Sequence, residues 1–263
     1  MTTTKRKTAL VTGASGGIGY ELATLFARDG IDLILVARQK EKLTAIQYDF
    51  EDRYSIRVDC VDMDLSAPDA PDHLYQFCQT NHLPVDYLIN NAGYGDYGKL
   101  VGVSAELYQN MLILNVLSLT KLTSLFIKDM VGRGFGRVLN IGSLAAFQPV
   151  PQMAVYGASK SYVMHFTEAL HAELKGTGVT ATVLNPGVTQ TGFVERANMG
   201  NAVYAQGKQL TAARVAQVGY RAMMAGKQNV VPGLLNRLLA ISTGLTPSRR
   251  LLLAISSFVM RQQ

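Results

Sequence analysis

The sequence predicts an α/β fold in which one parallel β-sheet is covered by helices on both faces. Short, nearly continuous apolar runs alternate with longer segments of helical periodicity along the 263 residues. A glycine-rich turn joins the first apolar run directly to the first helical segment. Since no internal repeat or long polar linker divides the chain, we expect a single domain over residues 1–263.

Seven segments are predicted to be strands because they are β-branched or leucine-rich and apolar on both faces. They are Thr8–Thr12, Asp32–Ala37, Ile56–Asp62, Tyr87–Asn90, Arg137–Ile141, Thr180–Leu184 and Asn229–Val231. The helices predicted between them are Ile18–Asp29, Lys40–Phe50, Asp69–Asn81, Ser104–Val131, Met153–Lys175 and Thr211–Ala225. With right-handed crossovers, this alternation indicates a Rossmann-type, doubly wound parallel sheet with strand order 3-2-1-4-5-6-7.

Composition narrows the class of protein. The chain is 48% apolar and 17% charged with a net charge of +6, which is typical of a globular protein, and it carries no nucleic-acid-binding motif. Cys60 and Cys78 form no CxxC pair, so we expect free thiols in a reducing compartment. The polar N-terminus lacks a secretory signal, and we therefore expect a cytoplasmic protein. The four histidines show no metal-binding spacing, and we expect no catalytic metal.

The glycine-rich turn reads Thr12-Gly13-Ala14-Ser15-Gly16-Gly17-Ile18-Gly19. Its glycines permit a tight turn and a close approach of backbone N–H groups to a phosphate, which the following helix N-terminus also attracts. Gly13, Ser15, Gly17, Ile18 and Gly19 are therefore predicted to bind a dinucleotide, with a plain strand–helix turn as the alternative. The same letters match G-x-S-x-G, a hydrolase nucleophile motif, but a serine after the first strand has no earlier loop to supply an oxyanion donor.

The ends of the second and third strands predict which dinucleotide binds. A site for NAD usually holds an Asp or Glu there for the ribose 2′-hydroxyl, whereas the second strand ends Ala37-Arg38. A guanidinium would pair with a 2′-phosphate, so Arg38 predicts NADP(H), unless it is simply a surface arginine. Asp64 and Leu65 after the third strand are expected to contact the adenine, although Asp64 could instead cap a helix.

A tyrosine and a lysine four residues apart, Tyr156 and Lys160, would share one face of a helix. A phenol with an ordinary pKa of about 10 is a poor proton donor or acceptor at neutral pH, and a nearby ammonium lowers that pKa. Ser143 follows the fifth strand, so its hydroxyl would reach the same sheet edge. Alone it would be a turn or N-cap residue.

Together these motifs resemble those of the short-chain dehydrogenase/reductase family, over about residues 7 to 232. The further matching motifs are Asn90-Asn91-Ala92-Gly93, Asn115 in the long helix, Asn185-Pro186-Gly187 and Thr191. The resemblance implies that Tyr156 exchanges a proton with the substrate oxygen, that Lys160 assists it and holds the nicotinamide ribose, that Ser143 orients the substrate, and that Asn115 supports a proton relay. It also implies that the cofactor is lined by Asn91, Ala92, Gly93, Tyr156, Lys160, Pro186, Gly187, Thr189 and Thr191.

The sequence thus predicts an NADP(H)-dependent oxidoreductase that reduces a carbonyl or oxidises the corresponding alcohol. NAD(H) is a less favoured cofactor, and a non-catalytic dinucleotide sensor on the same fold is the alternative function. Residues 187–210 are predicted to form a lid. An apolar substrate, a ketone or an acyl or lipid-like carbonyl, is expected from the side chains of Phe147, Val150, Met153, Phe193, Met199 and Tyr204.

Residues 233–263 form an apolar and basic extension with Arg237, Arg249, Arg250 and Arg261. Its last apolar run, Leu251 to Met260, is too short to span a bilayer. Three roles stay open for it: a peripheral membrane contact through residues 234–262, a cover for the substrate site, or a subunit contact. The apolar long helices Ser104–Val131 and Met153–Lys175, together with the resemblance, predict a homodimer or homotetramer.

Overall fold

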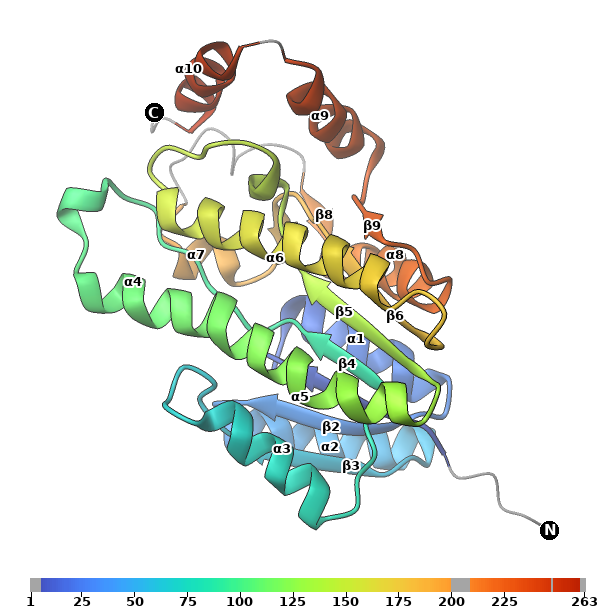
Figure 1. Cartoon of the computed structure of the whole chain (residues 1–263). Coiled ribbons are helices and arrows are strands. Elements are labelled where there is room, and N and C mark those ends of the chain that lie inside the picture. Colours follow the sequence, from blue (N-terminus) through green and yellow to red (C-terminus); the bar gives the residue numbers. More distant parts are fainter. Residues whose placement is uncertain (1–5, 200–208, 247, 261–263) are drawn as a thin grey trace.

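The computed structural model describes residues 6–199, 209–246 and 248–260 of the chain (Figure 1). Its main sheet has seven parallel strands in the order β3-β2-β1-β4-β5-β6-β9. They are β1 (Thr8–Thr12), β2 (Asp32–Ala37), β3 (Val58–Asp62), β4 (Tyr87–Asn90), β5 (Gly136–Ile141), β6 (Val179–Leu184) and β9 (Asn229–Val230). The predicted doubly wound sheet and its strand order are confirmed, because β9 is the seventh strand of this sheet. The short strands β7 (Thr189–Gln190) and β8 (Leu210–Thr211) pair separately.

Both faces of the sheet are covered by helices. On one face, α1 (Gly17–Arg28), α2 (Lys40–Tyr54) and α8 (Ala212–Met224) enclose an apolar core with strand residues such as Val11 and Leu35. On the other, α3 (Ala70–Thr80), α5 (Leu119–Gly132) and the end of α6 (Ala154–Glu173) pack against alternate strand residues such as Leu10 and Ile34. Two apolar faces explain why the strands lack the polar alternation of a half-exposed sheet.

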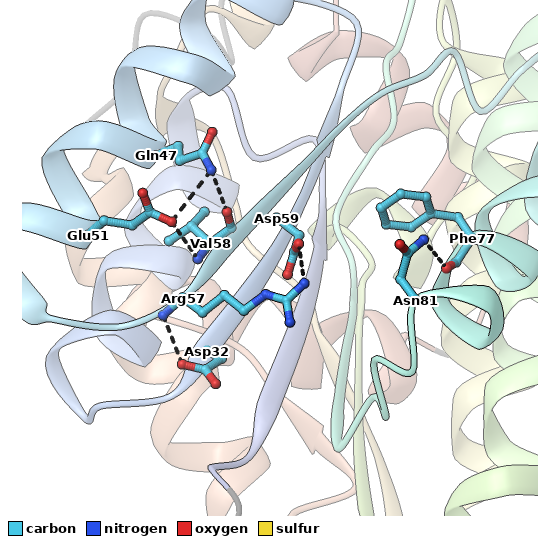
Figure 2. A network of polar contacts seen from close by, with 8 residues as sticks. All are labelled: Asp32, Gln47, Glu51, Arg57, Val58, Asp59, Phe77 and Asn81. Carbon is cyan, nitrogen blue, oxygen red and sulfur yellow. Dashed lines mark hydrogen bonds and ion pairs between the residues drawn. The ribbon is translucent and has the colours of Figure 1, made fainter.

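Strand β3 lies at the edge of the sheet and is held there by side chains of α2 (Figure 2). Gln47 donates a hydrogen bond to the carbonyl of Val58 (2.7 Å), and Glu51 accepts one from the Val58 N–H (3.1 Å). The Arg57 N–H donates to the side chain of Asp32, the first residue of the neighbouring strand β2 (2.9 Å). The two α2 side chains satisfy backbone groups of an edge strand. Strand β3 begins at Val58, two residues later than predicted.

The long helix predicted over Ser104–Val131 is interrupted. It consists of α4 (Ala105–Leu112), a π-helical turn η2 (Ile113–Ser118) and α5. The whole stretch Ala105–Gly132 is long and apolar enough to cross a membrane by length and composition. Its last part, α5, lies on the sheet, where Leu122, Phe126 and Met130 are buried. π-helical turns often mark functional sites, and this one contains Asn115.

The remaining elements gather around the carboxyl ends of the strands. They are η1 (Leu100–Gly102), η3 (Leu144–Phe147), α7 (Phe193–Arg196), α9 (Leu234–Leu245) and α10 (Arg249–Val259). Figure 1 shows α9 and α10 as a pair beyond η3 and α6, at the opposite end of the molecule from α2 and α3. Residues 200–208 of the predicted lid, among them Tyr204, and Pro247 and Arg261 of the extension lie outside the described residues.

Candidate active site

The glycine-rich loop connects β1 to α1 in a conformation that requires glycine. Gly13 and Gly17 have φ values of 66° and 56°, which side-chain-bearing residues rarely adopt. A Cβ atom on Gly19 would lie 2.4 Å from the carbonyl oxygen of Gly13, so the helix packs directly on the loop. No side chain caps the N-terminus of α1, and its first N–H groups therefore remain available for a phosphate. Ser15 and Gly16 line a depression of about 360 Å³ beside the loop.

The end of β4 is tied to this loop through Thr12. The Thr12 hydroxyl donates to the carbonyl of Ile89 (3.2 Å) and accepts hydrogen bonds from the N–H groups of Asn91 (2.9 Å) and Ala92 (3.0 Å). The Asn91 amide donates to the carbonyls of Thr12 (2.9 Å) and Gly13 (3.1 Å). Asn91 and Ala92 are thereby fixed beside the glycine loop, as predicted. Thr12 itself was not predicted, because one threonine at a strand end carries no distinctive signal.

Arg38 and Asp64 follow the adjacent strands β2 and β3 and form an ion pair of 3.7 Å. Asp64 accepts hydrogen bonds from the N–H (2.9 Å) and the hydroxyl (2.6 Å) of Ser66. Burial alone would raise the pKa of Asp64, but the bonds from Ser66 and the Arg38 guanidinium outweigh it and lower that pKa. Asp64 is not the N-cap of a helix, since α3 begins at Ala70. The carbonyl of Leu65, the next residue, accepts a hydrogen bond from Ser118 (2.6 Å).

Tyr156 and Lys160 lie in the first two turns of α6, and both are buried. The Lys160 Nζ donates a hydrogen bond to the carbonyl of Ile141 at the end of β5 (2.8 Å) and lies 5.8 Å from the centre of the Tyr156 ring. Burial lowers the pKa of the Lys160 ammonium to about 8. The predicted shared face is therefore present, and it places an amine beside the phenol.

Asn115 holds the start of α6 from the π-helical turn. Its amide accepts from the Tyr94 N–H (3.2 Å) and donates to the Tyr94 carbonyl (2.9 Å) and to the hydroxyl of Ser159 (3.2 Å). A Cβ atom on Gly93 would lie 2.9 Å from Asn115 Oδ1 and 3.5 Å from Lys160 Nζ. Asn115, Gly93 and Lys160 therefore lie close together. Ser159 was missed, although it directly precedes Lys160.

Ser143 follows β5 and begins the short helix η3. Its hydroxyl accepts a hydrogen bond from the N–H of Ala145 (3.1 Å), and its own N–H donates to Asn185 (3.0 Å). The short helix η3 that follows Ser143 packs against α6, the helix that carries Tyr156. The hydroxyl proton of Ser143 stays available for a substrate oxygen, because the bond to Ala145 uses an oxygen lone pair.

The segment after β6 returns to the glycine loop. The carbonyl of Pro186 accepts a hydrogen bond from Leu144 (2.8 Å), and the Thr189 hydroxyl donates to the carbonyl of Gly187 (2.9 Å). A Cβ atom on Gly17 would lie 3.1 Å from the methyl group of Thr191. Thr191, in the described part of the predicted lid, therefore packs on the glycine-rich loop.

An apolar cluster surrounds Tyr156. Of the side chains that the sequence predicted to surround the substrate, this cluster contains those of Val150, Met153, Phe193 and Met199. Phe147 does not join them, because it packs with Leu119, Val163 and other residues behind η3. The cluster also contains Tyr97, Met111 and Met260, which the sequence did not single out. Met260 comes from the C-terminal extension, and its carbonyl accepts hydrogen bonds from Tyr97 and from Gln152 (3.1 Å).

Two further findings bear on the chemistry of the site. Within the described part of the chain, no three His, Cys, Asp or Glu side chains come together as a metal site would require. Cys60 and Cys78 are free thiols, and burial raises the pKa of each, to about 11 and about 12. Neither group adds a reactive thiolate to this edge of the sheet.

A comparison with protein-family models decides the family. Residues 7–202 match the model of the short chain dehydrogenases. The chain belongs to the short-chain dehydrogenase family. This dehydrogenase is 36% identical over 194 residues to the ketoacyl reductase HetN of Nostoc sp., covering 73% of this chain and 67% of that protein. It is 31% identical over 177 residues to the human very-long-chain 3-oxoacyl-CoA reductase, covering 65% of this chain and 55% of that protein. The matched part of the dehydrogenase thus spans between about half and two thirds of these relatives.

A solved structure resembles this dehydrogenase over nearly its whole length. It is a short-chain dehydrogenase from Sphingobium yanoikuyae in complex with NADPH, with 30% sequence identity and a TM-score of 0.81, covering 91% of this chain and 94% of the other. The likeness therefore extends beyond the segment that matches the family model, into the C-terminal part of the dehydrogenase.

Proposed function

We propose that the chain is an NADP(H)-dependent reductase of apolar ketones or acyl carbonyls, with Ser143, Tyr156 and Lys160 as its catalytic residues. One observation carries the proposal: a buried amine, Lys160 Nζ, lies 5.8 Å from the ring of a tyrosine that faces an apolar cluster. Family membership supports oxidoreductase chemistry in general. The roles given below to individual residues are part of the proposal.

The glycine loop fits a dinucleotide. A pyrophosphate would bind where three features of this loop meet. Gly13 and Gly17 have left-handed backbone, the start of α1 has no side-chain cap, and Thr191 contacts Gly17. When bound, the nicotinamide would supply the hydride, which adds to the carbonyl carbon and leaves the oxidised cofactor. Asn91, Ala92, Gly93, Pro186, Gly187 and Thr189 would line its nicotinamide half.

The chain's own residues would supply the proton. The phenol of Tyr156 would donate its proton to the carbonyl oxygen of the substrate and would itself become a phenolate. The Lys160 ammonium stabilises that phenolate, since the opposite charges lie in a buried site. The Ser143 hydroxyl donates a hydrogen bond to the same substrate oxygen. Alcohol oxidation is the reverse, with the phenolate as the base.

Arg38 supports the preference for NADP(H). It stands at the end of β2, where a 2′-phosphate would lie, and its side chain is 69% exposed. A bound 2′-phosphate would take the place of the weak contact with Asp64, because a phosphate offers the guanidinium two charge-assisted bonds. NADPH is also the cofactor in the Sphingobium yanoikuyae structure.

The substrate class is inferred from the cluster around Tyr156. Met153, Phe193, Met199 and Met260 offer no charged group to a ligand, and the Tyr156 and Phe193 rings lie 5.4 Å apart. Apolar surroundings of this kind would favour an apolar ketone or acyl group next to the carbonyl. The names of the two relatives, a ketoacyl reductase and a 3-oxoacyl-CoA reductase, support a 3-oxoacyl thioester as the first substrate to test.

The subunit contact proposed for this enzyme lies on the outer face of η2, α5 and α6. Leu117 and Tyr162 are large apolar side chains exposed there, and the Tyr162 hydroxyl lies 3.0 Å from that of Thr120. Pairing this face with its copy in a homodimer or tetramer would bury both side chains. Light scattering of the native chain and of Leu117→Glu tests the contact, and an unchanged mass would argue against it.

The experiment that tests the function is a panel of carbonyls assayed with NADPH and with NADH. The panel contains 3-oxoacyl thioesters, bulky ketones and small polar ketones. We expect NADPH consumption that is fastest with the apolar members and much slower with NADH. Tight NADPH binding without turnover of any member would favour the non-catalytic sensor instead, and equal rates with NADH would contradict the NADP(H) preference.

A further inference from the structure

The C-terminal helices α9 and α10 expose an apolar face that nothing in the described chain covers. Its members, here called the C-terminal apolar face, are Leu234, Leu235, Leu238, Leu239, Ile241, Leu245, Leu251, Leu253, Ile255 and Phe258. Leu234 and Leu245, at the two ends of α9, are 73% and 76% exposed. Single exposed leucines are common on protein surfaces, but a contiguous set on two successive helices indicates a binding surface.

Seven of the ten members follow a helical period, and the other three, Leu235, Leu239 and Leu253, are exposed on other sides of the helices. Leu234, Leu238, Ile241 and Leu245 recur at intervals of four, three and four residues and so form one stripe along α9. Leu251, Ile255 and Phe258 repeat the pattern on α10. The buried residues Ala240 and Ser256 lie on other sides of these helices. Each helix therefore has one side on the protein and an apolar side turned outward.

The C-terminal extension is held against the rest of the protein by hydrogen bonds and packing. Ser256 donates a hydrogen bond to the carbonyl of Pro149 (2.7 Å), and Gln152 donates one to the carbonyl of Met260. At the start of α9, a Cβ atom on Gly187 would lie 2.7 Å from the amide nitrogen of Asn236. Helix α9 packs against η3, and Figure 1 shows α9 and α10 together beyond α6. The outward side chains thus belong to a fixed surface.

The charge of the chain is divided unevenly. All 19 acidic residues lie at or before Glu195. The residues after it carry only basic charges: Arg196, Lys208, Arg214, Arg221, Lys227, Arg237, Arg249, Arg250 and Arg261. Arg237 on α9 and the pair Arg249 and Arg250 at the start of α10 are exposed. The two helices therefore combine exposed apolar side chains with charges of one sign.

We propose that the C-terminal apolar face docks on an anionic lipid surface. Leucine and phenylalanine side chains would enter the headgroup boundary, and the arginines would pair with lipid phosphates, as interfacial helices do. A symmetric contact between two copies fits less well. Such a contact would bring together two copies of a segment that carries arginines and no carboxylate to pair with them. The apolar cluster around Tyr156, which contains Met260, would then lie next to the membrane.

The test is flotation of the purified full-length protein with lipid vesicles of phosphatidylcholine alone or mixed with phosphatidylglycerol. We expect the native chain to float with the mixed vesicles and not with phosphatidylcholine alone, and to be released by high salt. Leu238→Glu/Ile241→Glu and Arg249→Glu/Arg250→Glu should each lower the bound fraction by roughly tenfold or more, since each basic residue near the surface and each buried apolar group contributes. These side chains are exposed and outside the catalytic set, so turnover of a soluble carbonyl should be unchanged.

Matched controls carry the same charge changes elsewhere. Tyr48→Glu/Val131→Glu replaces exposed apolar side chains on α2 and α5, and Lys128→Glu/Lys175→Glu reverses two charges away from the extension. Both should float like the native chain. The proposal is overturned if the native chain stays soluble with both vesicles, or if the two patch variants float as well as the controls. It is also overturned if the patch variants change only the oligomer mass in light scattering, which would make the face a subunit interface.

Discussion

Asn115 and Ser159 connect the π-helical turn η2 to the start of α6, the helix that carries the proposed catalytic Tyr156. The Asn115 amide nitrogen lies 3.2 Å from the hydroxyl oxygen of Ser159, and that hydroxyl donates to the carbonyl of Tyr156 (2.7 Å). Asn115 also bonds to the backbone of Tyr94 on the other side. Because both side chains are buried, the π-helical turn and the start of α6 are held as one unit.

Because of this connection, Asn115→Leu and Ser159→Ala should each lower turnover, while the contacts that bind the phosphates of the cofactor should stay as they are. Each leaves a buried polar group unpaired, which costs about 1–3 kcal/mol of unfolding free energy, and a small shift of Tyr156 lowers kcat by roughly 10 to 100-fold. Stopped-flow kinetics and NADPH titration separate the two effects. Asn81→Ala, which removes an exposed bond on α3, is the control and should change neither. Native kcat in both site variants would refute the positioning role.

Gly95 should tolerate no side chain. A Cβ atom there would lie 3.0 Å from Tyr156 Cδ2, from Met153 Cε and from Phe193 Cζ. Gly95→Val is therefore expected to displace the Tyr156 ring and to lower kcat by roughly 100-fold. Gly98→Ala is the control, because a Cβ atom there meets its nearest neighbour, Val103, at an ordinary 3.5 Å. If Gly95→Val were as active as Gly98→Ala, the pocket would lie elsewhere.

Arg38→Asp should reverse the cofactor preference. The carboxylate would repel a 2′-phosphate and accept a hydrogen bond from a ribose 2′-hydroxyl, so NADPH affinity should fall by roughly 10 to 100-fold while NADH affinity rises. Fluorescence titration with both nucleotides measures the change. Arg28→Asp makes the same charge change at the far end of α1 and should leave the preference as it is. Parallel losses for both nucleotides in Arg38→Asp would argue against a 2′-phosphate contact.

The buried Lys160 predicts a particular pH dependence of stability in the cofactor-free protein. Its pKa is about 8 when folded, against about 10.4 in the unfolded chain. Between these values the unfolded state binds more protons, so this group makes the unfolding free energy rise with pH, and below about pH 8 it costs the fold about 3 kcal/mol. Lys160→Met removes that cost. Its stability relative to the native chain should therefore be greatest near pH 7 and decline toward pH 10 in urea unfolding. A difference that does not vary with pH would show that Lys160 titrates normally.

The sequence was sufficient for the architecture because strands buried on both faces leave uniform apolar runs, and Gly13, Gly17 and Gly19 mark the first crossover. It was sufficient for Tyr156 and Lys160 because a spacing of four on one helix fixes a shared face. It was not sufficient for Ser159 or Thr12, whose hydroxyls act through partners from other elements. The π-helical turn at Asn115 could not be predicted from the sequence either, because its residues have ordinary helical periodicity. Phe147 was wrongly placed in the pocket, because the direction of η3 is set by packing against α6.

The role of Tyr156 as the proton donor is tested most directly by comparing Tyr156→Phe with the native chain. The two quantities to compare are the rate of single-turnover NADPH oxidation and the dissociation constant of NADPH. Removing one hydroxyl from a buried ring keeps the packing with Phe193 and the position of Lys160. We predict a loss of at least roughly 1,000-fold in the rate with the dissociation constant of NADPH nearly unchanged, since the proton donor alone is gone. A variant that reduced its carbonyl substrate at the native rate would contradict the assignment of Tyr156 as the acid.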